Sequence, residues 1–210
     1  MPRQTRMVFP QVDAQPERSR ALDQLRRSIE TFVSLPEEVW AEVQKPWHLR
    51  PVRRGEQLTL EGEMESTFSL IVVGVQRLYF TTPDGDEHTV AFVYPPDYSG
   101  VPDSLFLQVP SAYGLDALSD GVILATGRNR LLELMERHRE LDRWAWRLFA
   151  SALAGRLKRE RELLTLTAQE RYERLLRESP QILQLAPLRH VASYLGMSPE
   201  TLSRARAAQL

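Results

Sequence analysis

The stretch LRHVASYLGMSPETLSR, residues 188–204, carries the most specific local pattern in the chain. Pro187 precedes it, and proline is tolerated in the first turn of a helix because the amide it lacks would have no partner there. Gly196 takes a positive φ easily, which ends a helix, and Ser198 followed by Pro199 is a typical helix start. The pattern predicts two short helices joined by a tight turn, the helix-turn-helix plan.

The second predicted helix presents a polar face that suits the major groove of DNA. Glu200, Ser203 and Arg204 fall on one side of it. Arginine can form two hydrogen bonds with guanine, glutamate can accept a hydrogen bond from cytosine N4, and serine can form a hydrogen bond with either base. The alternative is an ordinary helical hairpin with a polar surface. Hydroxyls, a cation and a helix N-terminus suit phosphates, and the residues expected there are Arg189, Ser198 and Thr201.

A long helical segment, residues 130–164, precedes this motif and contains no proline and one glycine. Its apolar residues form two stripes, so one helix needs two packing partners. We expect upstream β-structure on one side and a second copy of the chain on the other. The alternative is a helix buried within one monomer. The residues expected at the dimer interface are Leu141, Leu148, Phe149, Ala152, Leu153 and Leu157.

A break in the helical pattern follows at residues 165–167. Thr167 and Glu170 have the spacing of a capping box, which predicts the start of a new helix that ends before Pro180. A helix boundary at this point is also a candidate hinge between the two halves of the chain.

Residues 47–126 contain short segments rich in β-branched and aromatic residues, separated by turn signals. Asp84-Gly85 lies between two such segments and predicts a hairpin. Many short strands at close spacing indicate a small barrel or roll. Helices are expected over 21–34 and 37–44, with residues 1–20 as a loose arm.

Composition narrows the class of protein. The 210 residues include no Cys, which removes disulfides, thiolate metal sites and cysteine nucleophiles. Without a long apolar run or an apolar N-terminal signal core, we expect a cytoplasmic protein that has no membrane partner. Residues 1–129 carry 12 Lys and Arg against 18 Asp and Glu, whereas residues 130–210 carry 15 against 10. A basic C-terminal part suits a polyanion such as DNA.

The helix-turn-helix stretch resembles that of the Crp–Fnr family of bacterial transcription regulators. The segments RRGEQLTLEGE (53–63) and FSLIVVGVQRLYFTTPDGDEHTVAFVYPPDYSG (68–100) resemble that family's cyclic-nucleotide-binding roll. The resemblance implies an α+β fold with an N-terminal double-stranded β-roll (21–129), a dimerisation helix (130–164) and a C-terminal winged helix-turn-helix domain (165–210). Its wing is expected to be truncated. It further implies a homodimer that reads a pseudo-palindromic operator on double-stranded DNA, with RNA polymerase as a candidate partner.

The effector pocket of that family pairs a Gly-Glu with a later Arg-Ser/Thr-Ala. Here Val101 stands where the glutamate would be and Pro110 where the arginine would be. Without that cation, a buried phosphate would have only amides and a hydroxyl. We therefore do not expect a cyclic nucleotide to bind in this pocket, and the sequence indicates no other cofactor. The resemblance places the pocket at Gly100, Val101, Ser111 and Ala112, with Tyr79, Tyr98 and Tyr113 as residues that could fill it.

Two other classes of function were weighed against a regulator. An enzyme of the cupin type needs clustered metal ligands, but the four histidines are scattered and no metal site is expected. Neither a Gly-rich phosphate loop nor a Gly-x-Ser-x-Gly elbow is present, so we expect no enzyme. The remaining alternative is a roll that binds an effector or a protein partner and does not bind DNA specifically.

Overall fold

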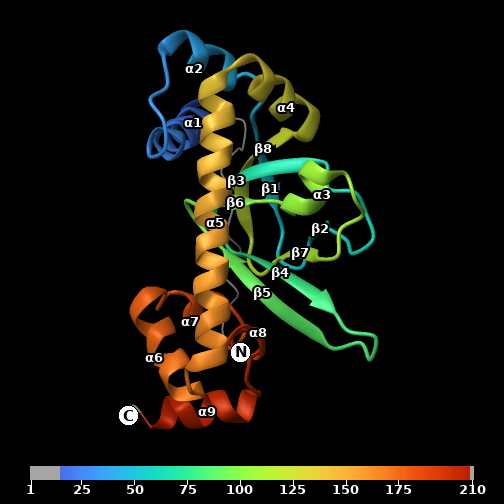
Figure 1. Cartoon of the computed structure of the whole chain (residues 1–210), viewed down its shortest axis with the longest axis vertical. Helices are drawn as coiled ribbons and strands as arrows, with labels where there is room; N and C mark the ends of the chain where they lie inside the picture. Colours follow the sequence, from blue (N-terminus) through green and yellow to red (C-terminus); the bar gives the residue numbers. More distant parts are fainter. Residues whose placement is uncertain (1–14, 209–210) are drawn as a thin grey trace.

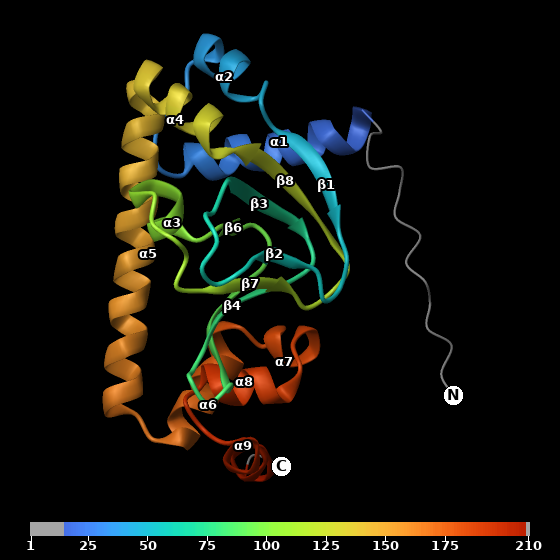
Figure 2. The ribbon, with the colours of Figure 1, turned by 90° about the vertical axis from the view of Figure 1, so that its right-hand side faces the viewer.

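The computed structural model describes residues 15–208 and contains two four-stranded antiparallel sheets that face one another (Figure 1, Figure 2). One sheet contains, in spatial order, β1 (His48–Val52), β8 (Gly121–Gly127), β3 (Thr67–Val73) and β6 (Tyr98–Ser99). The other contains β2 (Gln57–Thr59), β7 (Gly114–Ala117), β4 (Gln76–Thr81) and β5 (Glu87–Val93). The predicted roll is confirmed, and its strands lie within residues 48–127, close to the expected 47–126. The two-residue β6 is too short to leave a periodic signal.

The helices are α1 (Gln15–Glu30), α2 (Glu37–Val43), α3 (Pro102–Leu107), α4 (Arg128–Arg137), α5 (Arg139–Thr165), α6 (Ala168–Glu178), α7 (Ile182–Leu185), α8 (Leu188–Tyr194) and α9 (Pro199–Ala207). Helix α1 begins at residue 15, so the prediction of a loose arm over 1–20 is wrong for residues 15–20. Residues 1–14 of that arm lie outside the described part. None of the helices in the described range is long and apolar enough to cross a membrane.

The outer face of the β1–β8–β3–β6 sheet is covered by helices. Phe68 on β3 lies between two tryptophans, with ring centroids 6.2 Å from Trp47 and 6.0 Å from Trp144 of α5. The same apolar cluster takes in Leu25 from α1 and Leu131 from α4. Burial of these large side chains fixes α1, α4 and the first turns of α5 against the roll.

The predicted single helix over 130–164 is broken at His138. His138 has extended backbone angles, φ −123° and ψ 109°, and ends α4 before α5 begins. Leu134 of α4 and Leu141 of α5 are both buried in the cluster that covers the sheet. One straight helix would not follow both the edge of the roll and its long side (Figure 2). Packing therefore overrides a sequence that contains no helix breaker here.

The β4–β5 hairpin extends from the roll toward helices α6 to α9 (Figure 1). Gly85 at its tip has φ +88°, as the Asp-Gly signal predicts. Near the base of the hairpin, Val75 and Phe92 join an apolar cluster with Tyr172 of α6 and Val191 of α8. The roll and the C-terminal helices thus share one buried cluster.

Candidate nucleic-acid interface

Helices α8 and α9 form the predicted helix-turn-helix. Gly196 between them has φ +63°, and the Ser198 hydroxyl accepts a hydrogen bond from the Thr201 amide to cap α9. Leu202 and Ala205 of α9 are buried in the cluster shared with α8. Because this inner face is packed, the opposite side of α9 is fixed toward solvent at the end of the molecule remote from α2 (Figure 1).

Glu200, Ser203 and Arg204 are all exposed on α9. The Arg204 guanidinium donates to the Thr201 hydroxyl at 3.2 Å, which holds it along the helix. Hydrogen bonds from Ser198 and the backbone, together with the nearby Arg204 charge, lower the pKa of Glu200, so its carboxylate is ionised at neutral pH. The structure brings together one cation, one anion and one hydroxyl on a protruding surface, the set that can distinguish base edges.

The three residues expected at phosphates are not equally placed. Ser198 and Thr201 lie at the N-terminal end of α9, where free amides favour an anion. Arg189 is exposed in the first turn of α8, and its guanidinium lies 3.4 Å from the His190 ring. It therefore lies on the side of helices α6 to α9, here called the head, that faces the β4–β5 hairpin.

The seven residues expected around an effector do not share one cavity. Between the two sheets is a cavity of about 480 Å³, lined by Gly100 but not by the other six. Val101 is packed in an apolar cluster, and the Ser111 hydroxyl is bonded to the Tyr113 backbone. Tyr79 donates to Gln57 at 3.1 Å, Ala112 is exposed, and Tyr98 lies on the outer side of the roll against Phe68.

Comparison with known proteins agrees with this geometry. The cyclic nucleotide-binding domain family matches residues 49–138. A probable transcriptional activator from Rhizobium leguminosarum bv. viciae is 31% identical over 169 residues, covering 74% of this chain and 68% of the relative. The chain belongs to the Crp–Fnr family. It is a DNA-binding transcription regulator, in a family whose members act as dimers.

Solved structures of Crp–Fnr proteins share its fold. FixK2 from Bradyrhizobium japonicum superposes with a TM-score of 0.68 at 23% identity, covering 77% of this chain and 83% of that chain. A putative regulator of the crp/fnr family from Eubacterium rectale gives a TM-score of 0.64 at 14% identity, covering 83% of this chain and 84% of that chain. At these identities the likeness concerns the fold alone.

Helix α5 of this Crp–Fnr regulator carries an exposed apolar stripe. Trp146, Leu153, Leu157 and Leu164 recur at helical spacing with exposed fractions of 74%, 59%, 57% and 80%. Such large exposed apolar residues in one row mark a packing surface.

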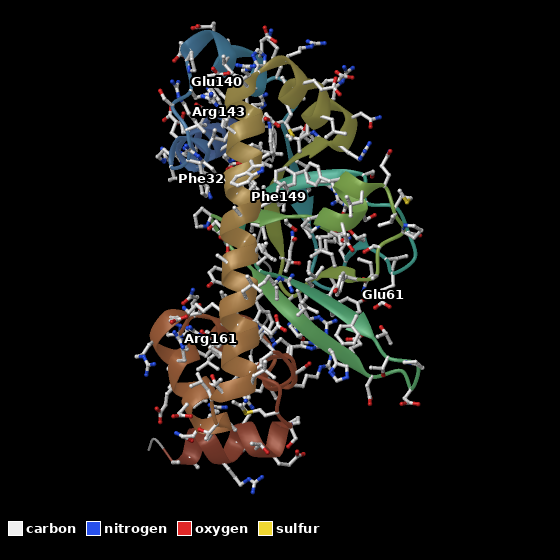
Figure 3. All side chains as sticks on the ribbon, viewed as in Figure 1. Phe32, Glu61, Glu140, Arg143, Phe149 and Arg161 are labelled. Carbon is white, nitrogen blue, oxygen red and sulfur yellow. The ribbon has the colours of Figure 1, made fainter. Side chains whose placement is uncertain are left out.

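The residues expected at the dimer interface differ in burial. Leu141 is buried in the protomer's own core, and Leu148 and Ala152 line a cavity against the roll. The assignment of Leu141 to the interface is therefore wrong, whereas the assignment of half-buried Leu148 and exposed Ala152 stays a prediction. Phe149 lies at the border, with its ring 4.8 Å from Phe106 of α3 (Figure 3).

A buried polar cluster, which the sequence analysis did not identify, joins the roll to the head. Arg77 on β4 is 3% exposed and donates to both Asp116 oxygens at 3.0 and 2.6 Å. It also forms an ion pair with Glu87 at 2.8 Å and donates to His190 Nδ1 of α8 at 2.8 Å. Beside it the Thr89 amide donates to the Ser193 hydroxyl at 2.9 Å. An arginine directly before the apolar run LYF of β4 was the available signal.

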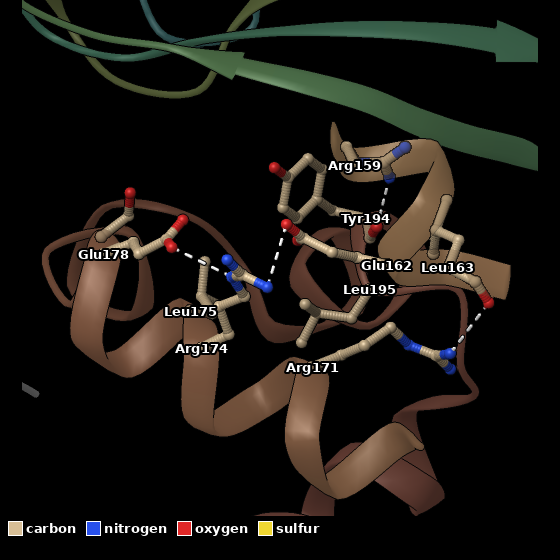
Figure 4. Close-up of a pocket in the computed structure, with 10 residues that line it drawn as sticks. Arg159, Glu162, Leu163, Arg171, Arg174, Leu175, Glu178, Tyr194 and Leu195 are labelled. Carbon is tan, nitrogen blue, oxygen red and sulfur yellow. Dashed lines mark hydrogen bonds and ion pairs between the residues drawn. The ribbon is translucent and has the colours of Figure 1, made fainter. Parts of the chain in front are cut away.

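A second set of arginines ties the head to the end of α5 (Figure 4). Arg171 of α6 donates to the Leu166 carbonyl at 2.8 Å, and Arg159 of α5 donates to the Tyr194 carbonyl and lies over its ring at 4.3 Å. Arg174 bridges Glu162 and Glu178. The capping box of Thr167 and Glu170 is present as predicted. Contacts from the roll and from α5 to the head therefore span the predicted hinge at residues 165–167.

His190 should make the stability of this regulator depend on pH. Burial, then the charges of Arg77 and Arg189, lower its pKa to about 4, while Asp116 and Glu87 oppose the shift. The unfolded chain takes up this proton near about pH 6.5 and the folded chain only near pH 4, so stability is lost as pH falls through that window. We expect the urea midpoint to drop between about pH 7 and pH 5 more steeply in the wild type than in His190→Asn. Equal slopes would contradict this assignment.

Proposed function

We propose that this regulator is a homodimer joined along the exposed stripe of α5 and that it reads a pseudo-palindromic operator with α9. Glu200, Ser203 and Arg204 are the proposed base contacts, and the observation that carries this is their common exposure on a helix whose opposite face is buried. Two such helices related by a two-fold axis suit half-sites one helical turn apart, about 34 Å.

Three further points belong to the same proposal. Ser198, Thr201 and Arg189 contact phosphates. The roll (21–129), the α4–α5 segment (130–164) and the DNA-binding part (165–210) act as the working units, with residues 165–167 as the hinge. The protein acts by occupying DNA, with RNA polymerase as a candidate contact, and carries no enzymatic activity.

The test is the substitution Arg204→Ala, assayed on a duplex that the protein itself selects from a random pool. We expect a loss of about 1–3 kcal/mol at one guanine per half-site and relaxed preference at that position, because a bidentate contact to O6 and N7 is lost. Binding is measured by fluorescence anisotropy at several salt concentrations.

Arg206→Ala is the matched control. It removes an exposed arginine two residues further along α9, and we expect it to change affinity without changing base preference. The reading role of Arg204 is refuted if Arg204→Ala and the wild type select the same sequences. A protein that retains no duplex at any salt concentration would refute the proposed function as a whole.

A further inference from the structure

A cavity of about 590 Å³ lies outside the space between the sheets, where the roll meets the inner side of α5. Its walls come from the end of α1, from residues 92–102 and from the α5 face that carries Leu148 and Ala152. None of the exposed stripe residues of α5 lines this cavity, so a partner packed on the stripe leaves this wall in place. The volume falls in the range of sites that hold small organic molecules, about 300–1,000 Å³.

Aromatic side chains dominate the lining. Phe32, Phe68, Phe92, Tyr98 and Phe149 contribute from five different elements or connecting segments, and Phe32 and Phe149 lie on either side of α5 in Figure 3. Phe68 and Tyr98 are stacked with centroids 5.2 Å apart, so one wall is already rigid. Flat rings of a ligand gain both apolar contact and edge or offset stacking in such a setting.

The lining contains one cation and one carboxylate. Arg27 of α1 is exposed, and no ion pair of Arg27 is found within residues 15–208, whereas its neighbour Arg26 is held by Glu30 and Glu37. Gln24 is also in the lining, but its side-chain amide already donates a hydrogen bond to the Ile71 carbonyl. Arg27 is thus the lining group available to pair with an acidic substituent, and Asp97 is the group that would oppose it.

We propose that this cavity binds a small aromatic compound with one acidic group, with the ring system among the phenylalanines and the acid on Arg27. The site adjoins the cavity between the sheets, with which it shares Ser99 and Gly100, and it does not depend on the missing cassette arginine.

The cavity is in contact with the DNA-binding head through Phe92. This residue lines the cavity, and its ring lies 5.2 Å from that of Tyr194 on α8. A ligand that shifts Phe92 therefore shifts the packing of α8, and a change in DNA affinity follows. This second step rests on the proposed function, whereas binding to the cavity does not.

Binding is tested on the full-length protein with two dyes. Anilinonaphthalene sulfonate has aromatic rings and a sulfonate, and phenylnaphthylamine has the rings alone. We expect saturable fluorescence enhancement with both. Arg27→Gln should weaken the sulfonate by about tenfold and leave the neutral dye unchanged, since a charged hydrogen bond is lost. Asp97→Asn should bind the sulfonate at least as well as the wild type.

Filling the cavity supplies the matched control. Ala152→Trp occupies the lining and should abolish enhancement by both dyes, whereas Ala154→Trp, exposed on the same helix and not in the lining, should not. Leu148→Trp repeats the test should Ala152→Trp fail to fold. The site is refuted if both dyes bind the two filling variants as they bind the wild type, or if Arg27→Gln lowers the affinity for both dyes equally. It is also refuted if the folded protein binds neither dye because another part of the dimer fills the cavity.

The coupling step is tested separately with Tyr194→Leu, which lies outside the lining. We expect this variant to bind the sulfonate dye as the wild type does, while the dye no longer changes its affinity for the selected duplex. A dye that binds the wild type and leaves its DNA affinity unchanged refutes the coupling and leaves the site intact. Loss of all duplex binding instead points to failure of the proposed function.

Discussion

Replacing Leu153 by aspartate is expected to dissociate the regulator into monomers and to weaken operator binding by about a hundredfold or more. The residue is 59% exposed in the protomer and sits at the centre of the apolar stripe on α5. A carboxylate there would be buried without a partner in the dimer. Because two half-sites are bound together only by a linked pair of heads, the monomer loses the gain from bivalent binding. Sedimentation velocity gives the mass and anisotropy gives the affinity.

Leu60→Asp is the control for this experiment. Leu60 is an exposed leucine of the roll, at 44%, and does not lie on α5, so the same chemical change there should leave both mass and DNA affinity unaltered. A Leu153→Asp protein that sediments as the wild type does would place the dimer interface elsewhere.

Replacing Arg77 by leucine is expected to lower the free energy of unfolding by about 3–5 kcal/mol, since it strands a buried carboxylate. Asp116 accepts two hydrogen bonds from this arginine, and its side chain is only 11% exposed. The same change removes the donor that holds His190 of α8. Urea unfolding followed by tryptophan fluorescence measures the loss.

The double variant Arg77→Leu, Asp116→Leu separates the two contributions. Removing both charges eliminates the stranded carboxylate, so we expect most of the lost stability to return. The connection between hairpin and head would still be missing, and DNA affinity should remain altered. A single variant that loses less than about 1 kcal/mol would show that solvent or another cation reaches Asp116.

Local chemistry made much of the fold predictable. Asp84-Gly85, Gly196, Ser198 and the Thr167–Glu170 pair each act within a few residues, and each occurs where the sequence indicates. Strand segments such as FSLIVV are recognisable because their composition suits a pleated, buried surface. The exposed positions on α9 could be predicted for the same reason, because the spacing of Leu202 and Ala205 fixes which side is packed.

Features that depend on tertiary packing were missed. The break at His138 follows from how α4 and α5 pack on the roll, and no local signal marks it. The Arg77–His190 contact joins residues 113 positions apart, which no short window can detect. The sequence indicates both stripes of α5, but only the packing shows that Leu141 is buried in the protomer while Leu153 and Leu157 are exposed.

The apolar cluster that contains Val75, Phe92, Tyr172 and Val191 has one more consequence. A fragment holding only α6 to α9 would lose the packing of Val75 and Phe92 and expose the head residues that contact them. We expect calorimetry of the intact chain to record a single endotherm for roll and head. Any swing of the head about residues 165–167 would then expose apolar residues of this cluster to water, and binding of DNA or of a small molecule would have to compensate for that exposure.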